Sequence, residues 1–169
     1  MKKIIVTGGA GFIGANLCKE LISLGHQVFS IDNYSTGLFD NHVRGVYYFN
    51  LDIKDEKNLE IISEADVVYH LAALARIQPS FNYPEQYFNS NVIGTFNVFN
   101  ACLKYSVPII LSGSSSHHSG KFKNPYTFTK DLSEEILTMY SQHFDLDQAI
   151  ARFYNVYGDY MIPSGSAYA

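Results

Sequence analysis

The sequence predicts a doubly wound α/β fold, in which helices cover both faces of a parallel sheet. Short apolar runs rich in β-branched residues alternate along the chain with longer segments of helical periodicity. Such alternation is typical of parallel strands joined by helical crossovers. With 169 residues, 47% of them hydrophobic, the chain is long enough for one domain with a substantial core.

Each predicted element follows from a local pattern. Strands are expected at the β-branched runs bounded by turn residues, which are 3–7, 27–31, 46–50, 66–70, 107–112 and 148–153. Helices are expected where apolar residues recur at helical spacing, at 12–24, 55–63, 84–105 and 125–143. The helix at 84–105 begins with a proline and is apolar on more than one face, which favours contact with both the sheet and a partner. Residues 158–169 show no pattern of helix or strand.

The first predicted strand runs directly into Val-Thr-Gly-Gly-Ala-Gly-Phe-Ile-Gly, which is the most informative motif of the chain. Gly9, Gly11 and Gly14 have the spacing of a dinucleotide-binding turn, where the backbone approaches a pyrophosphate at a helix N-terminus. Asp32 ends the second predicted strand, where a carboxylate takes the ribose hydroxyls of NAD and repels the extra phosphate of NADP. No lysine or arginine lies within 25–41, so the sequence predicts NAD as the cofactor.

Tyr126 and Lys130 form a second candidate site. Their spacing places both side chains on one face of a helix, and an ammonium near a phenol lowers the pKa of the phenol toward that of a general base. The same spacing also occurs on ordinary helix surfaces. It gains weight here because the serines 114–116 follow the strand at 107–112, at the edge of the sheet where ligands bind.

These motifs stand in order with His70-Leu-Ala-Ala, Asn91 and Arg152-Phe-Tyr-Asn-Val-Tyr-Gly. The sequence thereby resembles the extended short-chain dehydrogenase/reductases, and most of all the nucleotide-sugar epimerases of the UDP-galactose 4-epimerase type. The resemblance implies a Rossmann-like NAD-binding domain over 1–157. It also implies that Tyr126 takes a proton from a sugar hydroxyl while NAD accepts the hydride and later returns it to the opposite face.

The resemblance assigns a role to each matching residue. The catalytic residues would be Ser115, Tyr126 and Lys130, with Ser116 as the alternative serine. The residues implied to bind or support the cofactor are Gly8, Gly11, Phe12, Ile13, Gly14, Asp32, Asn33, Ser35, Thr36, Gly37, Asp52, Ile53, Leu71, Ala72, Ala73, Ala75, Asn91, Tyr126, Lys130 and Tyr154. Those implied to face the substrate are Arg76, Ser116 and Asn155. Asp52 could instead cap the helix that follows it, and Arg76 could be a solvated loop residue.

The sequence also departs from the family pattern. Dehydratases of the family carry acids just after the catalytic serine or threonine, whereas Ser115 is followed by Ser116 and His117, which favours an epimerase. The loop before Tyr126 is short, because Ser115 precedes it by only eleven positions. Residues 158–169 would begin the substrate lobe or form an irregular tail, so we expect a fragment or a short form that borrows a partner. The alternatives are a silent NAD-binding or scaffold protein, a dehydratase and a small-carbonyl reductase.

The remaining expectations concern partners and surroundings. A net charge of −4 without basic runs argues against nucleic acid, and no apolar run reaches membrane-spanning length. Cys18 and Cys102 fall in predicted helices and are expected as reduced core thiols. The chain starts with a short predicted strand and not with a signal peptide, so a soluble cytoplasmic protein is expected. The adjacent His117 and His118 are expected to be loop residues rather than metal ligands.

A homodimer is expected through the helices at 84–105 and 125–143. Their apolar surface exceeds what a monomer usually exposes, and the family pairs these helices. The residues that suggest this surface are Phe88, Phe96, Phe99, Leu132, Ile136 and Met139.

Overall fold

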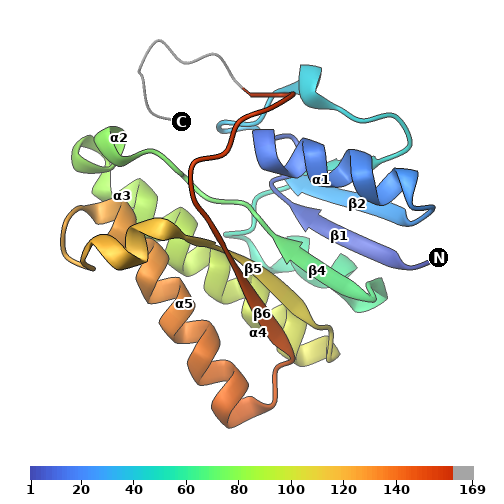
Figure 1. The fold of residues 1–169 in the computed structure, drawn as a ribbon. Helices are drawn as coiled ribbons and strands as arrows, with labels where there is room; N and C mark the ends of the chain where they lie inside the picture. Colours follow the sequence, from blue (N-terminus) through green and yellow to red (C-terminus); the bar gives the residue numbers. More distant parts are fainter. Residues whose placement is uncertain (162–169) are drawn as a thin grey trace.

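The computed structural model describes residues 1–161 and has a six-stranded parallel sheet in the order β3-β2-β1-β4-β5-β6 (Figure 1). The strands are β1 (Lys3–Thr7), β2 (Gln27–Asp32), β3 (Tyr47–Asn50), β4 (Val67–His70), β5 (Ile109–Ser114) and β6 (Gln148–Phe153). Every pair of neighbouring strands is parallel. The predicted doubly wound α/β fold is therefore confirmed.

Helices lie on both faces of this sheet (Figure 1). The long ones are α1 (Phe12–Ser23), α4 (Thr95–Tyr105) and α5 (Pro125–Phe144). The shorter helical segments are η1 (Phe39–Asn41), η2 (Glu56–Glu64), α2 (Ile77–Asn82), α3 (Pro84–Tyr87), η3 (Phe88–Gly94) and η4 (Ser115–Ser119). Alternate residues of β1 face opposite cores, because Ile4 packs with Cys18 of α1, whereas Ile5 packs with Val98 of α4 and Leu137 of α5.

Three helical segments differ from the prediction. The helix predicted at 84–105 is α3, a π-helical turn at η3 and then α4 in succession. The helix predicted at 55–63 is a 3-10 helix whose cap is Asp55, which accepts from Lys57 N at 3.1 Å, so Asp52 is not the cap. The residues after Arg76, where the sequence predicts no helix, form α2.

The fifth strand begins two residues later than predicted, at Ile109. Pro108 has no N–H to donate to a neighbouring strand, although its carbonyl accepts from Val68 N at 2.9 Å. The strand then extends through Ser114, which places this serine at the end of the sheet instead of in the loop.

The larger core lies between the sheet and the pair α4 and α5. Phe99 is fully buried in it, so the expectation that Phe99 belongs to an exposed dimer surface is wrong. Its ring is tilted by 55° against the ring of Tyr140, with centroids 6.0 Å apart, because α4 turns this position inward. Leu132 and Ile136 are half-buried, whereas Phe88, Phe96 and Met139 are exposed.

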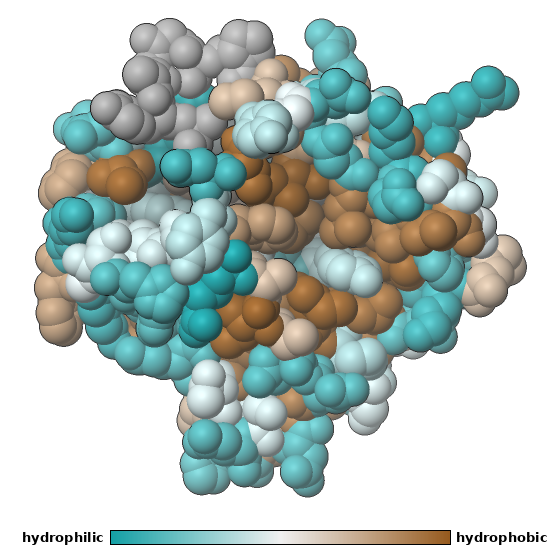
Figure 2. Space-filling view, viewed as in Figure 1, coloured by the Kyte–Doolittle hydropathy of each residue, from teal (hydrophilic) through white to brown (hydrophobic). Residues whose placement is uncertain are grey.

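The opposite face of the sheet is covered unevenly. Ile4 on β1 is buried beneath α1, but Tyr69 on β4 and Ile110 on β5 are only half-buried on that same face. Ala149 of β6 continues this row and is exposed. Figure 2 shows the hydrophobic area that results, in the centre of the view where Figure 1 places β4 and β5.

The chain that leaves β6 crosses the end of the sheet and reaches α1 (Figure 1). Asn16 Nδ2 donates to the carbonyl of Asp159 at 2.7 Å, and Asn41 Nδ2 donates to the carbonyl of Tyr160 at 3.4 Å. The predicted segment 158–169 falls outside the described residues from 162 onward. Within the part that is described, no helix has the length and apolar character needed to cross a membrane.

Candidate active site

The glycine turn is closely packed against the backbone around it, because two of its positions have no space for a side chain. Gly8 has a φ of +76°, and a Cβ there would lie 2.8 Å from Ala72 N. A Cβ on Gly14 would lie 2.1 Å from the carbonyl oxygen of Gly8. The first turn of α1 therefore packs directly against the backbone of the turn, and Gly11, its N-cap, has no capping side chain. The free N–H groups of this helix end remain available to an anion.

Asp32 ends β2 and ties this turn to the next loop. Its Oδ2 accepts from Ala10 N at 2.9 Å and its Oδ1 accepts from Tyr34 N at 2.9 Å. A Cβ on Gly37 would lie 3.0 Å from either carboxylate oxygen, so the loop passes close to the acid. The carboxylate of Asp32, which is predicted to bind ribose, thus stabilises the shape of the site in this structure.

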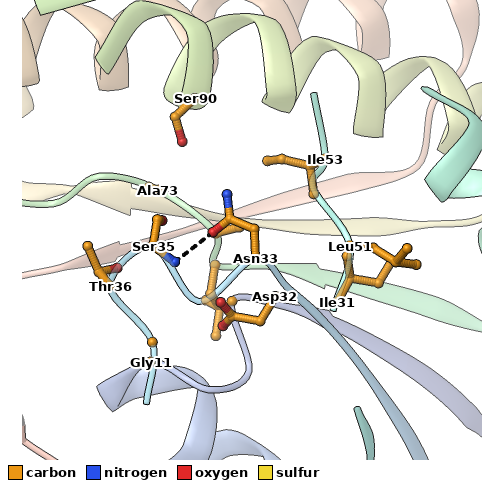
Figure 3. Close-up of a pocket in the computed structure, with 14 residues that line it drawn as sticks. Gly11, Ile31, Asp32, Asn33, Ser35, Thr36, Leu51, Ile53, Ala73 and Ser90 are labelled. Atoms are coloured by element: carbon orange, nitrogen blue, oxygen red, sulfur yellow. Dashed lines mark hydrogen bonds between the residues drawn. The ribbon is translucent and has the colours of Figure 1, made fainter. Parts of the chain in front are cut away.

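A cleft lies between the glycine turn, the ends of β2 and β4, and η3 (Figure 3). The predicted cofactor residues that line it are Gly8, Gly11, Asp32, Asn33, Ser35, Thr36, Gly37, Ile53, Leu71, Ala72 and Ala73. Asn33 Oδ1 accepts from Ser35 N at 3.0 Å, which orders this rim. Three lining residues were missed, namely Ile31, Leu51 and Ser90, because no motif marks them and only the fold brings them together.

The other predicted cofactor residues do not line this cleft, and they are Phe12, Ile13, Gly14, Asp52, Ala75, Asn91, Tyr126, Lys130 and Tyr154. Some of these residues instead hold in place the residues that line the cleft. Asp52 accepts from Asn33 Nδ2 at 3.0 Å and from Lys54 N at 2.9 Å, so it orients a residue of the rim.

Asn91 holds two segments of the site together from within the π-helical turn. Its side chain accepts from Leu74 N at 2.8 Å and donates to the carbonyl of Leu74 at 3.0 Å. It also donates to Thr129 Oγ1 of α5 at 3.1 Å. Single π-helical turns are frequent at functional sites, and this one brings Asn91 to the loop that follows β4.

His70 connects the two halves of the sheet. Its Nδ1 lies 2.6 Å from Thr7 Oγ1 and its Nε2 lies 2.9 Å from Thr95 Oγ1. Burial, together with the positive charge of Lys130, lowers the pKa of His70 to about 3. The imidazole is therefore neutral at ordinary pH and serves as a core residue.

Tyr126 pairs with a serine that the sequence analysis did not choose. Its phenol donates to Ser114 Oγ at 3.2 Å. Ser115 and Ser116 follow in η4, and Ser116 Oγ donates to Ser114 Oγ at 2.9 Å. The choice of Ser115, with Ser116 as alternative, therefore differs from the contact in the structure. The cause is the later end of β5, which carries Ser114 to the edge of the sheet.

Lys130 is buried beneath the same site. Its Nζ donates to the carbonyl of Ser112 at 2.6 Å, and burial lowers its pKa to about 8, although the nearby Glu134 opposes that change. Burial raises the pKa of Tyr126, while the hydrogen bond with Ser114 acts in the opposite direction. The prediction that Lys130 lowers the pKa of Tyr126 is wrong for this structure. The Lys130 ammonium is directed at the carbonyl of Ser112, and the pKa of Tyr126 is raised.

The residues expected to face the substrate are spread along the rim. Arg76 is half-buried and its carbonyl accepts from Tyr87 Oη at 2.6 Å, whereas Asn155 is exposed. Tyr154 is exposed and its ring stacks near that of His118, with centroids 6.4 Å apart. His117 Nδ1 lies 3.1 Å from Asp131 Oδ1. Within 1–161, no group of three or more His, Cys, Asp or Glu side chains is arranged to hold a metal ion.

Cys18 and Cys102 lie in α1 and α4 as free, buried thiols, which confirms the expectation for both. Burial raises the pKa of each thiol to about 12. Both are therefore unreactive core groups.

Comparison with known proteins adds a family. The sequence matches the NAD dependent epimerase/dehydratase family over residues 4–167. It is 32% identical over 180 residues to a putative UDP-glucose 4-epimerase of Methanocaldococcus jannaschii, with 97% of this chain and 59% of that protein covered.

Two solved structures are similar in fold as well as in sequence. The UDP-glucose 4-epimerase of Thermotoga maritima with UDP-glucose gives a TM-score of 0.90 at 30% identity, covering 96% of this chain and 59% of that one. The Thermus thermophilus UDP-glucose 4-epimerase complex with NAD gives a TM-score of 0.86 at 30% identity, covering 98% and 59%. The chain thus spans about three fifths of the length of these relatives.

Proposed function

This chain belongs to the NAD dependent epimerase/dehydratase family, and on that premise we propose that it is the NAD-binding part of a nucleotide-sugar epimerase. The substrate class would be a UDP-sugar, and the reaction a transient oxidation at one sugar carbon. The observation that carries this proposal is the hydrogen bond from Tyr126 to Ser114 at the same edge of the sheet as the glycine turn. Tyr126, the candidate general base, thus lies at the edge of the sheet that also carries the site shaped for a dinucleotide.

The residues around the glycine turn fit NAD. Gly14 lets the start of α1 pack against the turn, and the N–H groups of this helix end have no side-chain cap and would receive a pyrophosphate. Asp32 is a carboxylate at the end of β2. NAD would be preferred to NADP, because the described cleft is lined by that acid and by no lysine or arginine. When bound, NAD supplies the hydride acceptor and donor of the reaction.

The catalytic residues in this proposal are Tyr126, Lys130 and Ser114. Tyr126 removes the proton from a sugar hydroxyl and returns it after the keto-sugar has rotated. Ser114 donates a hydrogen bond to the reacting oxygen, in the role that the sequence analysis gave to Ser115. Lys130 carries a positive charge below a pH of about 8, and this charge favours the phenolate when the ammonium turns from Ser112 toward the phenol.

We propose that the substrate lobe begins near residue 158, after an NAD-binding domain at 1–157. The chain spans 59% of the solved relatives, so the surfaces that orient a nucleotide-sugar would lie largely in other parts of such a protein. Orientation carries much of the barrier reduction in enzymes. The described chain by itself is therefore expected to bind NAD but to turn over sugar slowly. Its buried free thiols fit a cytoplasmic location.

The test is turnover of UDP-glucose and UDP-galactose, measured with the purified chain and with a form extended to the length of its relatives. Interconversion by either form supports the epimerase. NAD binding without interconversion by the extended form would favour the silent scaffold, and net NADH oxidation with a simple carbonyl compound would favour the reductase. Elimination of water is not expected, because the two positions after Ser114 are Ser115 and Ser116 and carry no acid.

We further propose a homodimer through the outer faces of η3, α4 and α5. Phe88, Ile93, Phe96 and Met139 are each between 38% and 43% exposed on these segments. A cluster of apolar side chains of this kind is unusual on a monomer. Light scattering at micromolar concentration should give a dimer, and Phe96→Ser should dissociate it. The control is Phe122→Ser, which changes a phenylalanine that is 83% exposed on another segment. A monomer at every concentration would refute the dimer.

A further inference from the structure

Glu134 is a buried acid directly behind the proposed catalytic residues. It lies on α5 one turn beyond Lys130, and its side chain is only 5% exposed. One carboxylate oxygen, Oε2, accepts from Arg152 Nε at 2.9 Å and from Arg152 Nη2 at 2.7 Å. The other oxygen, Oε1, accepts from the backbone N–H of Ser114 at 3.3 Å. The acid therefore joins α5 to β6 and to the residue that contacts Tyr126.

Gly113 makes the space in which this carboxylate lies. A Cβ on Gly113 would lie 2.5 Å from Glu134 Oε1 and 2.8 Å from Arg152 Cγ. The φ of Gly113 is not in the left-handed region, so the glycine is required here for space rather than for backbone conformation. A carboxylate packed this closely fixes the position of the strand end.

Ser114 is consequently held at two points. Its backbone N–H is held by Glu134, and its hydroxyl accepts from the Tyr126 phenol at 3.2 Å. The ion pair of Glu134 with Arg152 is a weak source of stability, because the Arg152 side chain is 37% exposed and solvent screens its charge. A role in holding the active site accounts better for the contact of Glu134 with Ser114 and for its position one helical turn from Lys130.

We propose that Glu134 is a positioning residue of the active site, which fixes the backbone of Ser114 for Tyr126 and acts on the phenol through its negative charge. This rests on the proposed function. The effect of the Ser114 backbone contact and the effect of the Glu134 charge can be separated. The charge of Glu134 contributes to the raised pKa of Tyr126, after burial as the larger cause, whereas the Ser114 hydrogen bond lowers that pKa.

The other titratable or charged groups around the phenol and the carboxylate are not substituted in this comparison. They come from each element packed against the site, and they are Tyr87 of α3, His70 of β4, His117 of η4, Lys130 and Asp131 of α5, and Arg152 of β6.

The test is an ultraviolet titration of phenolate absorbance on the full chain. The signal of Tyr126 is the difference between each protein and the same protein with Tyr126→Phe. Glu134→Gln keeps an oxygen that can accept from Ser114 N–H but removes the charge, so Tyr126 should titrate at a lower pH than in the unchanged chain. Gly113→Ala keeps the charge but displaces the carboxylate from the strand, so Tyr126 should titrate at a higher pH.

The matched control is Glu135→Gln, which removes the neighbouring acid, 59% exposed and paired with Lys121 on the surface. It should leave the Tyr126 titration unchanged. Glu134→Gln and Gly113→Ala shifts in opposite directions support the proposal, and an unchanged titration in both overturns it. If Glu134→Gln fails to fold, Gly113→Ala decides alone, and the absence of an upward shift overturns the proposal. The titration requires no turnover, so its failure is distinguishable from failure of the epimerase assay.

Discussion

The molecule has two halves that are built differently. The nucleotide half, residues 3–50, contains β1, β2, β3 and α1, and its strand β1 is buried on both faces from Ile4 to Thr7. The catalytic half, residues 67–153, contains β4, β5, β6, α4 and α5, and one face of its strands is half-exposed. The cleft at the glycine turn is lined mainly by residues of the nucleotide half, with Leu71, Ala72, Ala73 and Ser90 added from the catalytic half. Ser114 and Tyr126, by contrast, both come from the catalytic half, from β5 and α5.

The two halves also differ in how their site residues are held and in how fully their strands are covered. The glycine turn and Asp32 are held by contacts within the nucleotide half, such as the bond from Ala10 N to Asp32 at 2.9 Å. The catalytic half has its reactive groups in contact but leaves Ile110 and Ala149 without full cover. Binding of a cofactor and turnover of a substrate are therefore expected to depend on different parts of the molecule, and each can be disturbed by itself.

The largest expected effect is that of Tyr126→Phe. Removal of a general base typically lowers a rate by about 10²–10⁴-fold. The ring can still pack against Tyr87, whose centroid lies 6.5 Å away, so the affinity for NAD should stay close to that of the unchanged chain. Epimerase kinetics in the extended form and calorimetry with NAD measure the two effects. Undiminished turnover would show that another group is the base, and a large loss of NAD affinity would break the division into halves.

The uneven cover of the sheet can be tested with two isoleucines on the same face. Ile4→Ala in the nucleotide half removes a side chain that is 2% exposed, and should lower the free energy of unfolding by about 2–5 kcal/mol. Ile110→Ala in the catalytic half should cost clearly less, because this side chain is half-exposed. Urea unfolding of both variants measures the difference. Equal losses would mean that the catalytic half is covered in solution.

Asp32→Ala tests the nucleotide half alone. The loss of hydrogen bonds to a charged group should weaken NAD binding by about 1.5–3 kcal/mol, and the unchanged chain should bind NAD more tightly than NADP. Because Asp32 also holds Ala10 N and Tyr34 N, the variant should unfold at a lower temperature as well. Asp40→Ala, an exposed acid in η1, is the control. Equal calorimetric affinities for the two cofactors would contradict the assignment.

The smallest effect, counted for a change of one pH unit, concerns His70, which links the two halves. The folded chain lowers the pKa of His70 from 6.5 to about 3, so below pH 6.5 the unfolded chain takes up a proton that the folded chain does not. The free energy of unfolding should therefore fall by about 1.4 kcal/mol for each pH unit between 6.5 and 3 because of this group. His70→Gln should have a shallower pH dependence in urea unfolding. An identical slope in both proteins would mean that His70 is not buried neutral.

Local patterns were enough to predict most of the fold. Each strand, α1 and α5 lie within two residues of their predicted places, because buried parallel strands and amphipathic helices have distinct periodicities. The helix predicted at 84–105 is divided, and α4 begins only at Thr95. The π-helical turn at Phe88–Gly94 and the helix at Ile77–Asn82 were not predicted. Their backbone is set by contacts such as that of Asn91 with Leu74, which lie outside any local window.

The sequence by itself determined the parallel sheet, the glycine turn and the family, because these depend on residues that are near one another along the chain. Only the tertiary structure decided that Ser114, and not Ser115, meets Tyr126, and that the carboxylate of Glu134 lies against Gly113. The physical reason is that one residue of register moves a side chain to the other face of a strand. The end of β5 is set by its pairing with β6, from Ile109 with Gln148 to Ser114 with Phe153.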